Sequence, residues 1–299
     1  MPEARAGKPD VTARDASLMK RAAYASLGIS VGLVAIKAFA YLLTSSVAVL
    51  ASLADSSLDL FTSTLNLIAI HSALTPADDE HRFGHGKAEP LAGLAQFAFI
   101  VASAGFITVQ AIGRFIRPEP VEHGTTALII MVISLIGAFA IVAYQRYVVS
   151  KTGSIAIGAD KIHYTGDMVT VGGVILAIVL ATRFGWQLAD PIIALFVAAA
   201  LVWAALSVFR PAYDQLMDRE LADDDRARIE RIVRAHAEVT GLHELRTRAA
   251  GLHTFIQLHI ELPPDMSLIR ATKVSAEVEE SLCAAFPNAE VIIHQDPAA

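Results

Sequence analysis

Two pairs of ionisable residues lie inside long apolar stretches of the sequence. Asp55 and Asp59 are four residues apart, and His163 and Asp167 repeat that spacing in a later stretch. Residues four apart share one face of a helix, so each pair offers two metal ligands in one direction. A charged side chain is costly in the middle of a bilayer and is a functional candidate by default. Because carboxylate oxygen and imidazole nitrogen bind divalent ions such as Zn2+, the two pairs predict one site with four ligands.

The charge of this four-residue set suits an exchange of metal for protons. Three carboxylates and a neutral imidazole carry a charge of -3, which a divalent ion reduces to -1. An empty site is expected to take up protons instead, because crowded carboxylates disfavour one another's ionised form. The alternative is a polar contact between helices, a role that usually falls to Ser, Thr, Asn or Gln.

The composition places these pairs in a membrane protein. The chain has 299 residues, of which 54% are hydrophobic and 18% charged, and its mean hydropathy is +0.50. Such a chain is too apolar for an ordinary soluble enzyme. Its single cysteine, Cys283, excludes an internal disulfide. No strongly basic patch indicates a nucleic acid as partner.

Six apolar segments are each near or above the length that a helix needs to cross about 30 Å of hydrocarbon. They are residues 20–43, 47–75, 89–115, 124–149, 155–183 and 188–209. We therefore expect a mobile tail at 1–15 and an all-α transmembrane domain with six helices at 16–211. Lys and Arg near the spans are more numerous on the side of the two termini, which predicts cytoplasmic termini. At about 1.5 Å per residue, both ionisable pairs then lie near the bilayer midplane.

Residues 212–299 are predicted to form a cytoplasmic domain, and they contain 16 acidic and 9 basic residues. Their pattern predicts a helix at 226–236, strands at 242–248 and 254–262, a helix at 268–286 and a strand at 291–296. This αββαβ order is typical of a small α+β fold with its helices on one sheet face. So short a unit has a small core, which favours a dimer.

Two further groups of possible ligands each allow two interpretations. Asp78, His81 and His85 have separations that suit a small chelate, or they belong to a solvated acidic loop with incidental histidines. The other group lies on the predicted cytoplasmic strands and comprises His243, His259, His294 and Asp296. Side chains two apart on a strand share a face, which brings most of this group together. Histidines that are exposed on a sheet also occur without a metal.

The complete set of motifs resembles the cation diffusion facilitator family, and within it the bacterial zinc and iron proton antiporters. The motifs are Asp55-x3-Asp59, His163-x3-Asp167, Pro76-Ala77-Asp78-Asp79, Phe83-Gly84-His85-Gly86-Lys87-Ala88-Glu89 and Ile292-Ile293-His294-Gln295-Asp296-Pro297. The resemblance implies a homodimer in the bacterial inner membrane, with six spans per protomer and a cytoplasmic domain of metallochaperone-like fold. It also implies that protons are the counter-ion and that Zn2+ or Fe2+ is carried.

The resemblance assigns a role to each group of residues. It implies that the four intramembrane residues bind the transported ion, that the loop group binds a metal, and that the cytoplasmic group binds metal at the dimer interface. It further implies a salt bridge between Lys87 and Asp218 that couples the two domains. Relatives often have a further histidine where this chain has Thr272, so the cytoplasmic group either holds one ion rather than two or recruits His253.

The combined prediction is a proton-coupled exporter of divalent transition-metal cations. Zn2+ and Fe2+ are the leading candidates, and Cd2+ and Co2+ share the same ligand preferences. No organic cofactor and no enzyme activity are expected. A membrane metal receptor without transport is the alternative, although it needs no carboxylates at the midplane. A membrane metalloprotease is disfavoured because the chain has no His-Glu-x-x-His motif.

Overall fold

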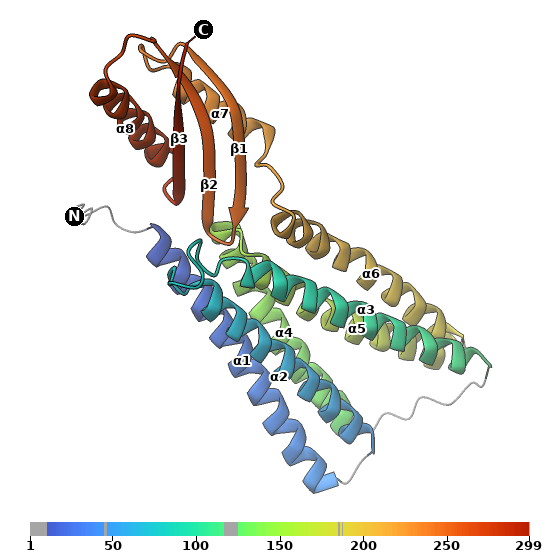
Figure 1. Ribbon diagram of the computed structural model, residues 1–299. Helices are drawn as coiled ribbons and strands as arrows, with labels where there is room; N and C mark the ends of the chain where they lie inside the picture. Colours follow the sequence, from blue (N-terminus) through green and yellow to red (C-terminus); the bar gives the residue numbers. More distant parts are fainter. Residues whose placement is uncertain (1–10, 45–46, 117–124, 185, 187, 299) are drawn as a thin grey trace. The chain divides into compact units, whose positions relative to one another are not determined.

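A computed structural model describes residues 11–44, 47–116, 125–184, 186 and 188–298 of the chain. These residues form helices α1 to α6, followed by α7, β1, β2, α8 and β3 (Figure 1). The chain divides into two compact units, one of which is Asp15–Tyr213 while the other includes Asp214–Ala299. The predicted fold class, a helical transmembrane domain followed by a small α+β domain, is confirmed.

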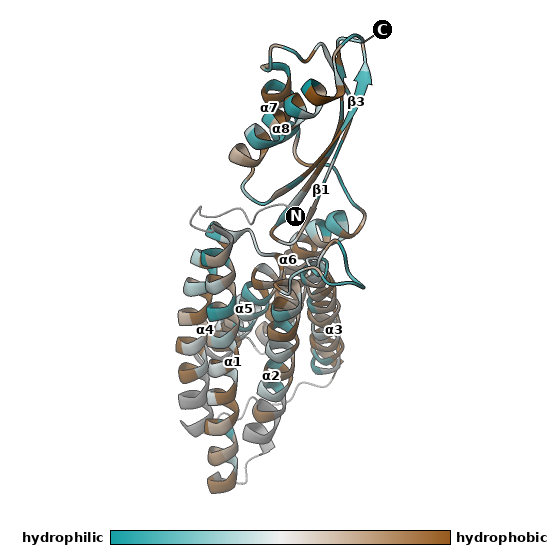
Figure 2. Ribbon diagram, turned by 60° about the vertical axis from the view of Figure 1, so that its left-hand side comes forward, coloured by the Kyte–Doolittle hydropathy of each residue, from teal (hydrophilic) through white to brown (hydrophobic). Residues whose placement is uncertain are grey.

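The helical unit contains six long helices, one for each predicted apolar segment. They are α1 (Val11–Thr44), α2 (Val47–Ala73), α3 (Ala88–Ile116), α4 (Thr125–Thr152), α5 (Ile155–Phe184) and α6 (Ala189–Leu216). Hydrophobic residues recur along all of these helices (Figure 2). Within the described residues, parts of α1, α3, α4 and α6 are long and apolar enough to cross a membrane. Helices α2 and α5 are not among them, and they carry the ionisable pairs, so six spans remain a prediction.

Two boundaries differ from the sequence prediction. Helix α1 begins at Val11, inside the predicted tail, whose residues 1–10 lie outside the described part of the chain. Helix α6 continues through Pro211 to Leu216, beyond the predicted apolar segment at 188–209. A proline inside a helix removes one backbone hydrogen bond. Packing overrides this cost, because Val208 and Ala212 on either side are buried.

Gly173 of α5 leaves room for two side chains of α6. A Cβ atom on Gly173 would lie 3.0 Å from Cγ2 of Ile193 and 3.2 Å from Cγ2 of Val197. The neighbouring Gly172 has no such atom within 4 Å. Of these two glycines, only Gly173 therefore lies in close contact with α6. Membrane helices often pack through such small residues.

The cytoplasmic unit has the predicted element order. Its elements are α7 (Asp223–Arg234), β1 (Gly241–Ala250), β2 (His253–Leu262), α8 (Leu268–Ala285) and β3 (Ala289–Pro297). The sheet order is β1-β2-β3, with β1 antiparallel and β3 parallel to β2. Parallel neighbours need a crossover connection, and α8 supplies it.

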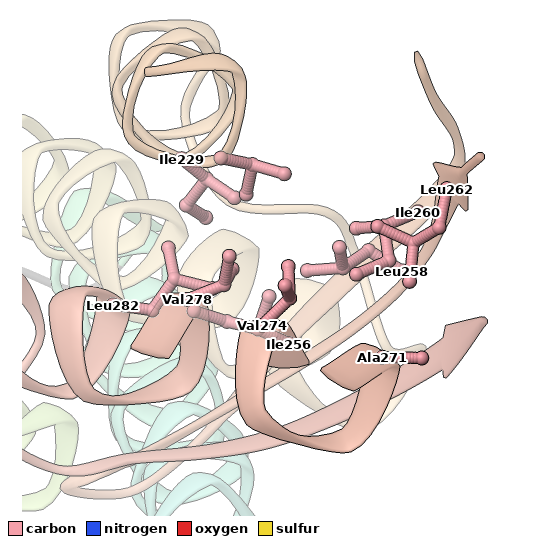
Figure 3. Close-up of a cluster of buried hydrophobic side chains, with 10 residues drawn as sticks. Ile229, Ile256, Leu258, Ile260, Leu262, Ala271, Val274, Val278 and Leu282 are labelled. Atoms are coloured by element: carbon pink, nitrogen blue, oxygen red, sulfur yellow. The ribbon is translucent and has the colours of Figure 1, made fainter. Parts of the chain in front are cut away.

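Alternation along β2 separates the core from the ligand face. Ile256, Leu258, Ile260 and Leu262 are buried against residues of α7 and α8 (Figure 3). Successive side chains of a strand point to opposite faces, so His259 lies on the face away from this core. Ser267 begins α8 by accepting a hydrogen bond from the backbone N–H of Arg270, which satisfies one unpaired donor of the first turn.

Candidate metal centre

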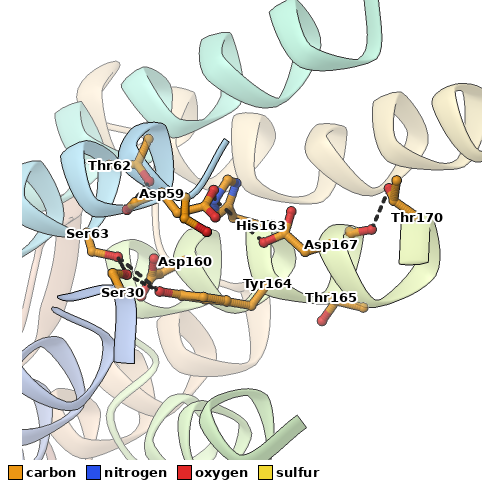
Figure 4. Close-up of polar contacts among 12 residues, drawn as sticks. Ser30, Asp59, Thr62, Ser63, Asp160, His163, Tyr164, Thr165, Asp167 and Thr170 are labelled. Carbon is orange, nitrogen blue, oxygen red and sulfur yellow. Dashed lines mark hydrogen bonds and ion pairs between the residues drawn. The ribbon is translucent and has the colours of Figure 1, made fainter. Parts of the chain in front are cut away.

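Helices α2 and α5 bring three of the four predicted transport ligands together (Figure 4). Nε2 of His163 lies 3.1 Å from Oδ1 of Asp59 and 3.8 Å from Oδ2 of Asp167. One ligand atom from each residue lies within 4.8 Å of the other two. The spacing of four residues on α5 places His163 and Asp167 on one helical face, as the sequence predicts. The set can therefore surround a single ion.

The fourth predicted ligand, Asp55, lies outside this group of three. It precedes Asp59 by one turn of α2, and its residue is exposed, whereas Asp59 is half-buried. A tetrahedral ion needs four ligands or three and an open position. The described geometry supplies three, and the participation of Asp55 stays a prediction.

A cluster of hydroxyl groups holds α5 against α1 and α2 beside the site. The Tyr164 side chain is buried, and its hydroxyl oxygen lies 2.7 Å from Oγ of Ser30 and 3.2 Å from Oγ of Ser63. Ser26 contributes a further hydroxyl, with its Oγ 3.1 Å from that of Ser63. Because Tyr164 follows His163 directly, this cluster fixes the helix segment that presents the imidazole. We did not single out these residues from the sequence.

Two further ionisable residues of the helical unit were also missed. Asp160 on α5 is fully buried, and its Oδ2 accepts a hydrogen bond of 2.6 Å from Nε2 of Gln145 on α4. Lys37 on α1 is 6% exposed and donates a hydrogen bond of 2.6 Å to Oγ of Ser56. Both lie in predicted spans, so the rule that selected the aspartates as costly intramembrane charges could have found them.

The predicted loop group is brought together between α2 and α3. Nδ1 of His81 lies 3.3 Å from Oδ1 of Asp78, and Nε2 of His85 lies 3.4 Å from its Oδ2. The backbone N–H of His81 donates to Asp78, which holds the pKa of that carboxyl below its ordinary value. Gly84, with a φ of +76°, supplies a turn that side chains rarely allow. Asp78 and His81 are exposed, and His85 is half-buried.

The cytoplasmic group lies in a row across the three strands. The strand register pairs His243 with His259 and His259 with His294. Oδ2 of Asp296 lies 2.8 Å from Nδ1 of His259 and 3.1 Å from Nε2 of His243. Oδ1 of Asp296 lies 3.4 Å from Nε2 of His294. The hydrogen bond with His259 is the main cause that holds the pKa of the Asp296 carboxyl below its ordinary value.

Imidazole nitrogens around one carboxylate match the preferences of Zn2+. His243, His259 and Asp296 place one ligand atom each within 4.8 Å of one another. His294 and Glu244 are among the residues around an adjoining hollow of about 250 Å³. Three of the four residues predicted for this site therefore fit a resident divalent ion, and the participation of His294 stays a prediction.

Two alternatives for the cytoplasmic group depend on His253 and Thr272. His253 begins β2, six residues before His259, which at about 3.3 Å per residue is far outside bonding distance. Thr272 is an exposed residue of α8, and its hydroxyl donates to the backbone carbonyl of Leu268. Within the described part of this protomer, the group therefore contains neither residue.

The predicted salt bridge between Lys87 and Asp218 joins residues of different units and stays a prediction. Lys87 lies in the turn directly before α3. Oδ1 of Asp218 lies 3.2 Å from Nη1 of Arg248 within the cytoplasmic unit. Asp218 therefore has a local basic partner that the sequence did not reveal.

Comparison with known proteins covers almost the whole chain. The family model for the cation efflux transmembrane domain matches residues 23–217, and the model for the cytoplasmic domain of cation efflux proteins matches residues 221–298. The cation-efflux pump FieF of Klebsiella pneumoniae is 41% identical over 280 residues, which are 94% of this chain and 93% of the relative. FieF of Salmonella arizonae has the same identity and coverage. A solved structure of CzrB in its Zn form is 28% identical and covers 27% of this chain and 92% of that one, with a TM-score of 0.25.

Proposed function

This chain belongs to the cation efflux family, and from that premise we propose that it exports divalent transition-metal cations in exchange for protons. The proposed cargo is Zn2+ or Fe2+, with Cd2+ and Co2+ as further candidates. The FieF relatives are cation-efflux pumps. The activity that we assign to the candidate site residues is therefore transport and not enzyme catalysis. We place the protein in a bacterial inner membrane with both termini in the cytoplasm.

The group formed by Asp59, His163 and Asp167 carries this proposal. Its ligand atoms lie within 4.8 Å of one another, and they come from two helices whose other residues are mostly apolar. Intramembrane ionisable residues that face one another mark ion pathways more often than structural contacts. Asp55, one turn away on α2, is the proposed fourth ligand. Metal enters this site from the cytoplasm and leaves on the opposite side.

Protons are the proposed counter-ion because the empty site carries too much negative charge for apolar surroundings. When the metal leaves, Asp55, Asp59 and Asp167 lose the positive charge that balances them. Protons that bind to these carboxylates and to His163 restore the balance. Alternating access then couples the two ions, since metal binds the deprotonated site and protons bind the empty one. We expect His163 to be the principal group that titrates.

The cytoplasmic domain is proposed to dimerise and to sense metal. Its matching family model describes the cytoplasmic domain of cation efflux proteins. His243, His259 and Asp296 bring their ligand atoms within 4.8 Å of one another, and His294 is the proposed fourth ligand. A resident metal ion, bound by these four residues, would stabilise one conformation of the domain. For this to regulate transport, metal must bind two states of the protein with different affinity.

Metal flux into proteoliposomes under an imposed pH gradient tests the function. We expect the parent protein to carry Zn2+ and Asp59→Ala, folded and of unchanged oligomeric state, to carry almost none. Asp79→Ala is the matched control, because it removes an exposed carboxylate of the loop outside the proposed sites. Flux of Asp59→Ala at the parent rate would show that the site is wrong.

The same assay separates an exporter from a metal receptor. A receptor binds Zn2+ at its cytoplasmic residues but carries no metal across the vesicle membrane. Binding without flux in the parent protein would therefore overturn the export proposal. Competition among Zn2+, Fe2+, Cd2+ and Co2+, under reducing conditions that preserve Fe2+, then identifies the preferred cargo.

A further inference from the structure

Lys37 is a buried cation in α1 that the transport mechanism above does not use. Its side chain is 6% exposed, and among the described residues it is the only buried lysine or arginine. The ammonium donates a hydrogen bond of 2.6 Å to Oγ of Ser56, which is also buried. A charge in this position is costly, so its retention in a membrane helix calls for a specific partner.

The position of Lys37 follows from the polar seam between α1 and α2. Ser26 and Ser30 lie one turn apart on α1, and both contact Ser63 of α2. Lys37 lies about two turns beyond Ser30 on the same face of α1, and it reaches Ser56, two turns before Ser63. These contacts therefore place the Lys37 ammonium next to the turn of α2 that contains Asp55 and Asp59.

The ammonium interacts with the charges of the proposed site. Ser56 directly follows Asp55 and precedes Asp59 by one helical turn. Asp55, Asp59 and Asp167 are the carboxylates whose charges attract the Lys37 ammonium. The hydrogen bond to Ser56 thus holds one positive charge at a level of α2 between Asp55 and Asp59, without making the lysine a metal ligand.

We propose that Lys37 is a tethered counter-charge that weakens metal binding at the transport site and so speeds metal release. This inference rests on the proposed function of that site. When the metal is bound, two cations share the same carboxylates, and their repulsion favours departure of the mobile one. When the site is empty, the ammonium remains and offsets part of the exposed negative charge.

The sign of the effect distinguishes this role from a structural one. The loaded site, with three carboxylates, a divalent ion and Lys37, sums to zero charge. Without the ammonium, the same carboxylates hold the metal more strongly, because the repulsion is gone. Damage to packing or to ligand geometry would weaken binding instead. Tighter binding together with slower turnover is therefore specific to the loss of the charge.

The test compares charge and hydrogen bonding at one position in the full-length protein. Lys37→Gln removes the charge and keeps a donor for Ser56, Lys37→Arg keeps the charge, and Ser56→Ala removes the hydroxyl acceptor. Lys20→Met on the same helix is the matched control. Zn2+ affinity in detergent and the KM and Vmax of flux in proteoliposomes are measured at one neutral pH for every variant, so that the ammonium keeps its proton throughout.

We expect Lys37→Gln to bind Zn2+ about tenfold more tightly and to show a lower KM and a lower Vmax. Lys37→Arg and Lys20→Met are expected to stay near the parent values. Ser56→Ala is expected to move in the direction of Lys37→Gln by a smaller factor, since it frees the ammonium but keeps its charge.

Unchanged or weaker Zn2+ binding by a folded Lys37→Gln would overturn the inference. If that variant does not fold, unchanged or weaker Zn2+ binding by Lys37→Met and by Ser56→Ala would overturn the inference instead. A parent protein that carries no Zn2+ would instead overturn the proposed function, so the two failures are distinguishable.

Discussion

In the helical unit, Asp59, His163 and Asp167 lie between apolar helices, whereas His243, His259 and Asp296 lie on a sheet face of the cytoplasmic unit. The side chains of the two groups have similar exposed fractions, 17–42% in the first and 28–43% in the second. Exposure alone therefore does not separate them. The two groups differ in their balance of carboxylate and imidazole and in the medium around them.

This difference teaches what each site can do. The membrane group holds two carboxylates, or three with Asp55, in surroundings that cannot screen charge. It must contain a metal or protons, which is the requirement for an exchanger. The cytoplasmic group holds one carboxylate and two imidazoles, or three with His294, and water screens the charge of a bound ion. It can keep a metal without exchanging it, which suits a sensor.

Removal of one histidine from each group gives the largest expected contrast. We expect His163→Ala to lower Zn2+ flux by at least about 100-fold, since even partners outside the ligand shell cost 10–100-fold in affinity or activity. His259→Ala is expected to lower flux only a few-fold at low Zn2+, with recovery at high Zn2+. Flux against Zn2+ concentration in proteoliposomes measures both effects.

Equal losses of flux in the two variants would contradict the division of roles. His236→Ala controls for loss of an imidazole elsewhere in the cytoplasmic unit, where His236 contacts Glu277 rather than the metal-binding group. Its flux is expected to stay close to the parent value at every Zn2+ concentration.

The second contrast concerns packing at two neighbouring glycines of α5, the helix that carries His163 and Asp167. We expect Gly173→Ala to destabilise the helical unit by about 1–3 kcal/mol, because the added methyl group overpacks the contact with Ile193 and Val197. Gly172→Ala meets open space and is expected to be neutral or slightly stabilising. Thermal unfolding of the full-length protein in detergent measures the difference. Equal midpoints for the two variants would exclude close α5–α6 packing at Gly173.

The smallest effect is expected in the charged network of the cytoplasmic unit. Nε2 of His236 lies 2.9 Å from Oε2 of Glu277, and this hydrogen bond is the main cause that lowers the pKa of the Glu277 carboxyl. A lowered pKa stabilises the fold above the unfolded-state pKa, and this contribution is lost as pH falls through the folded-state value. Glu277→Gln should therefore destabilise α8 slightly at neutral pH.

The effect of Glu277→Gln is expected to fade as pH falls below the ordinary glutamate pKa. It should disappear once the pH is below the lowered folded-state value, where Glu277 is protonated in both states. Hydrogen exchange of α8 in the full-length protein, compared with the parent at each pH, measures this. Glu280→Gln, at an exposed position of the same helix, is the control. A difference that persists in acid would mean that the ionised carboxylate of Glu277 is not its cause.

Periodicity predicted most of the fold because the two units use distinct patterns. Alternation in Thr254 to Leu262 indicated a strand with one buried face, and β2 extends over His253–Leu262 with that face in the core. The spacing of Asp59, His163 and Asp167 predicted a shared site, which the structure brings together. The end of α6 was not predictable from Pro211, because buried neighbours carry the helix past it.

Other features depend on contacts that spacing does not reveal. The sequence contains Lys37 and Asp160 in apolar segments, but their partners Ser56 and Gln145 lie on other helices. The separation of Asp55 from the group of three depends on how α2 is rotated against α5. Asp218 has Arg248 as a partner because β1 lies nearby in the same unit. Each of these features can be recognised only once the tertiary arrangement of the helices and strands is known.

Simultaneous recording of metal and proton movement in the same proteoliposomes tests the central claim most directly. With a fluorescent metal indicator and a pH indicator inside the vesicles, each addition of external Zn2+ should produce Zn2+ entry and alkalinisation of the lumen together. Asp59→Ala should abolish both signals, and collapse of the pH gradient should slow Zn2+ entry. Zn2+ entry at the full rate with no accompanying proton movement would contradict exchange at the site formed by Asp59, His163 and Asp167.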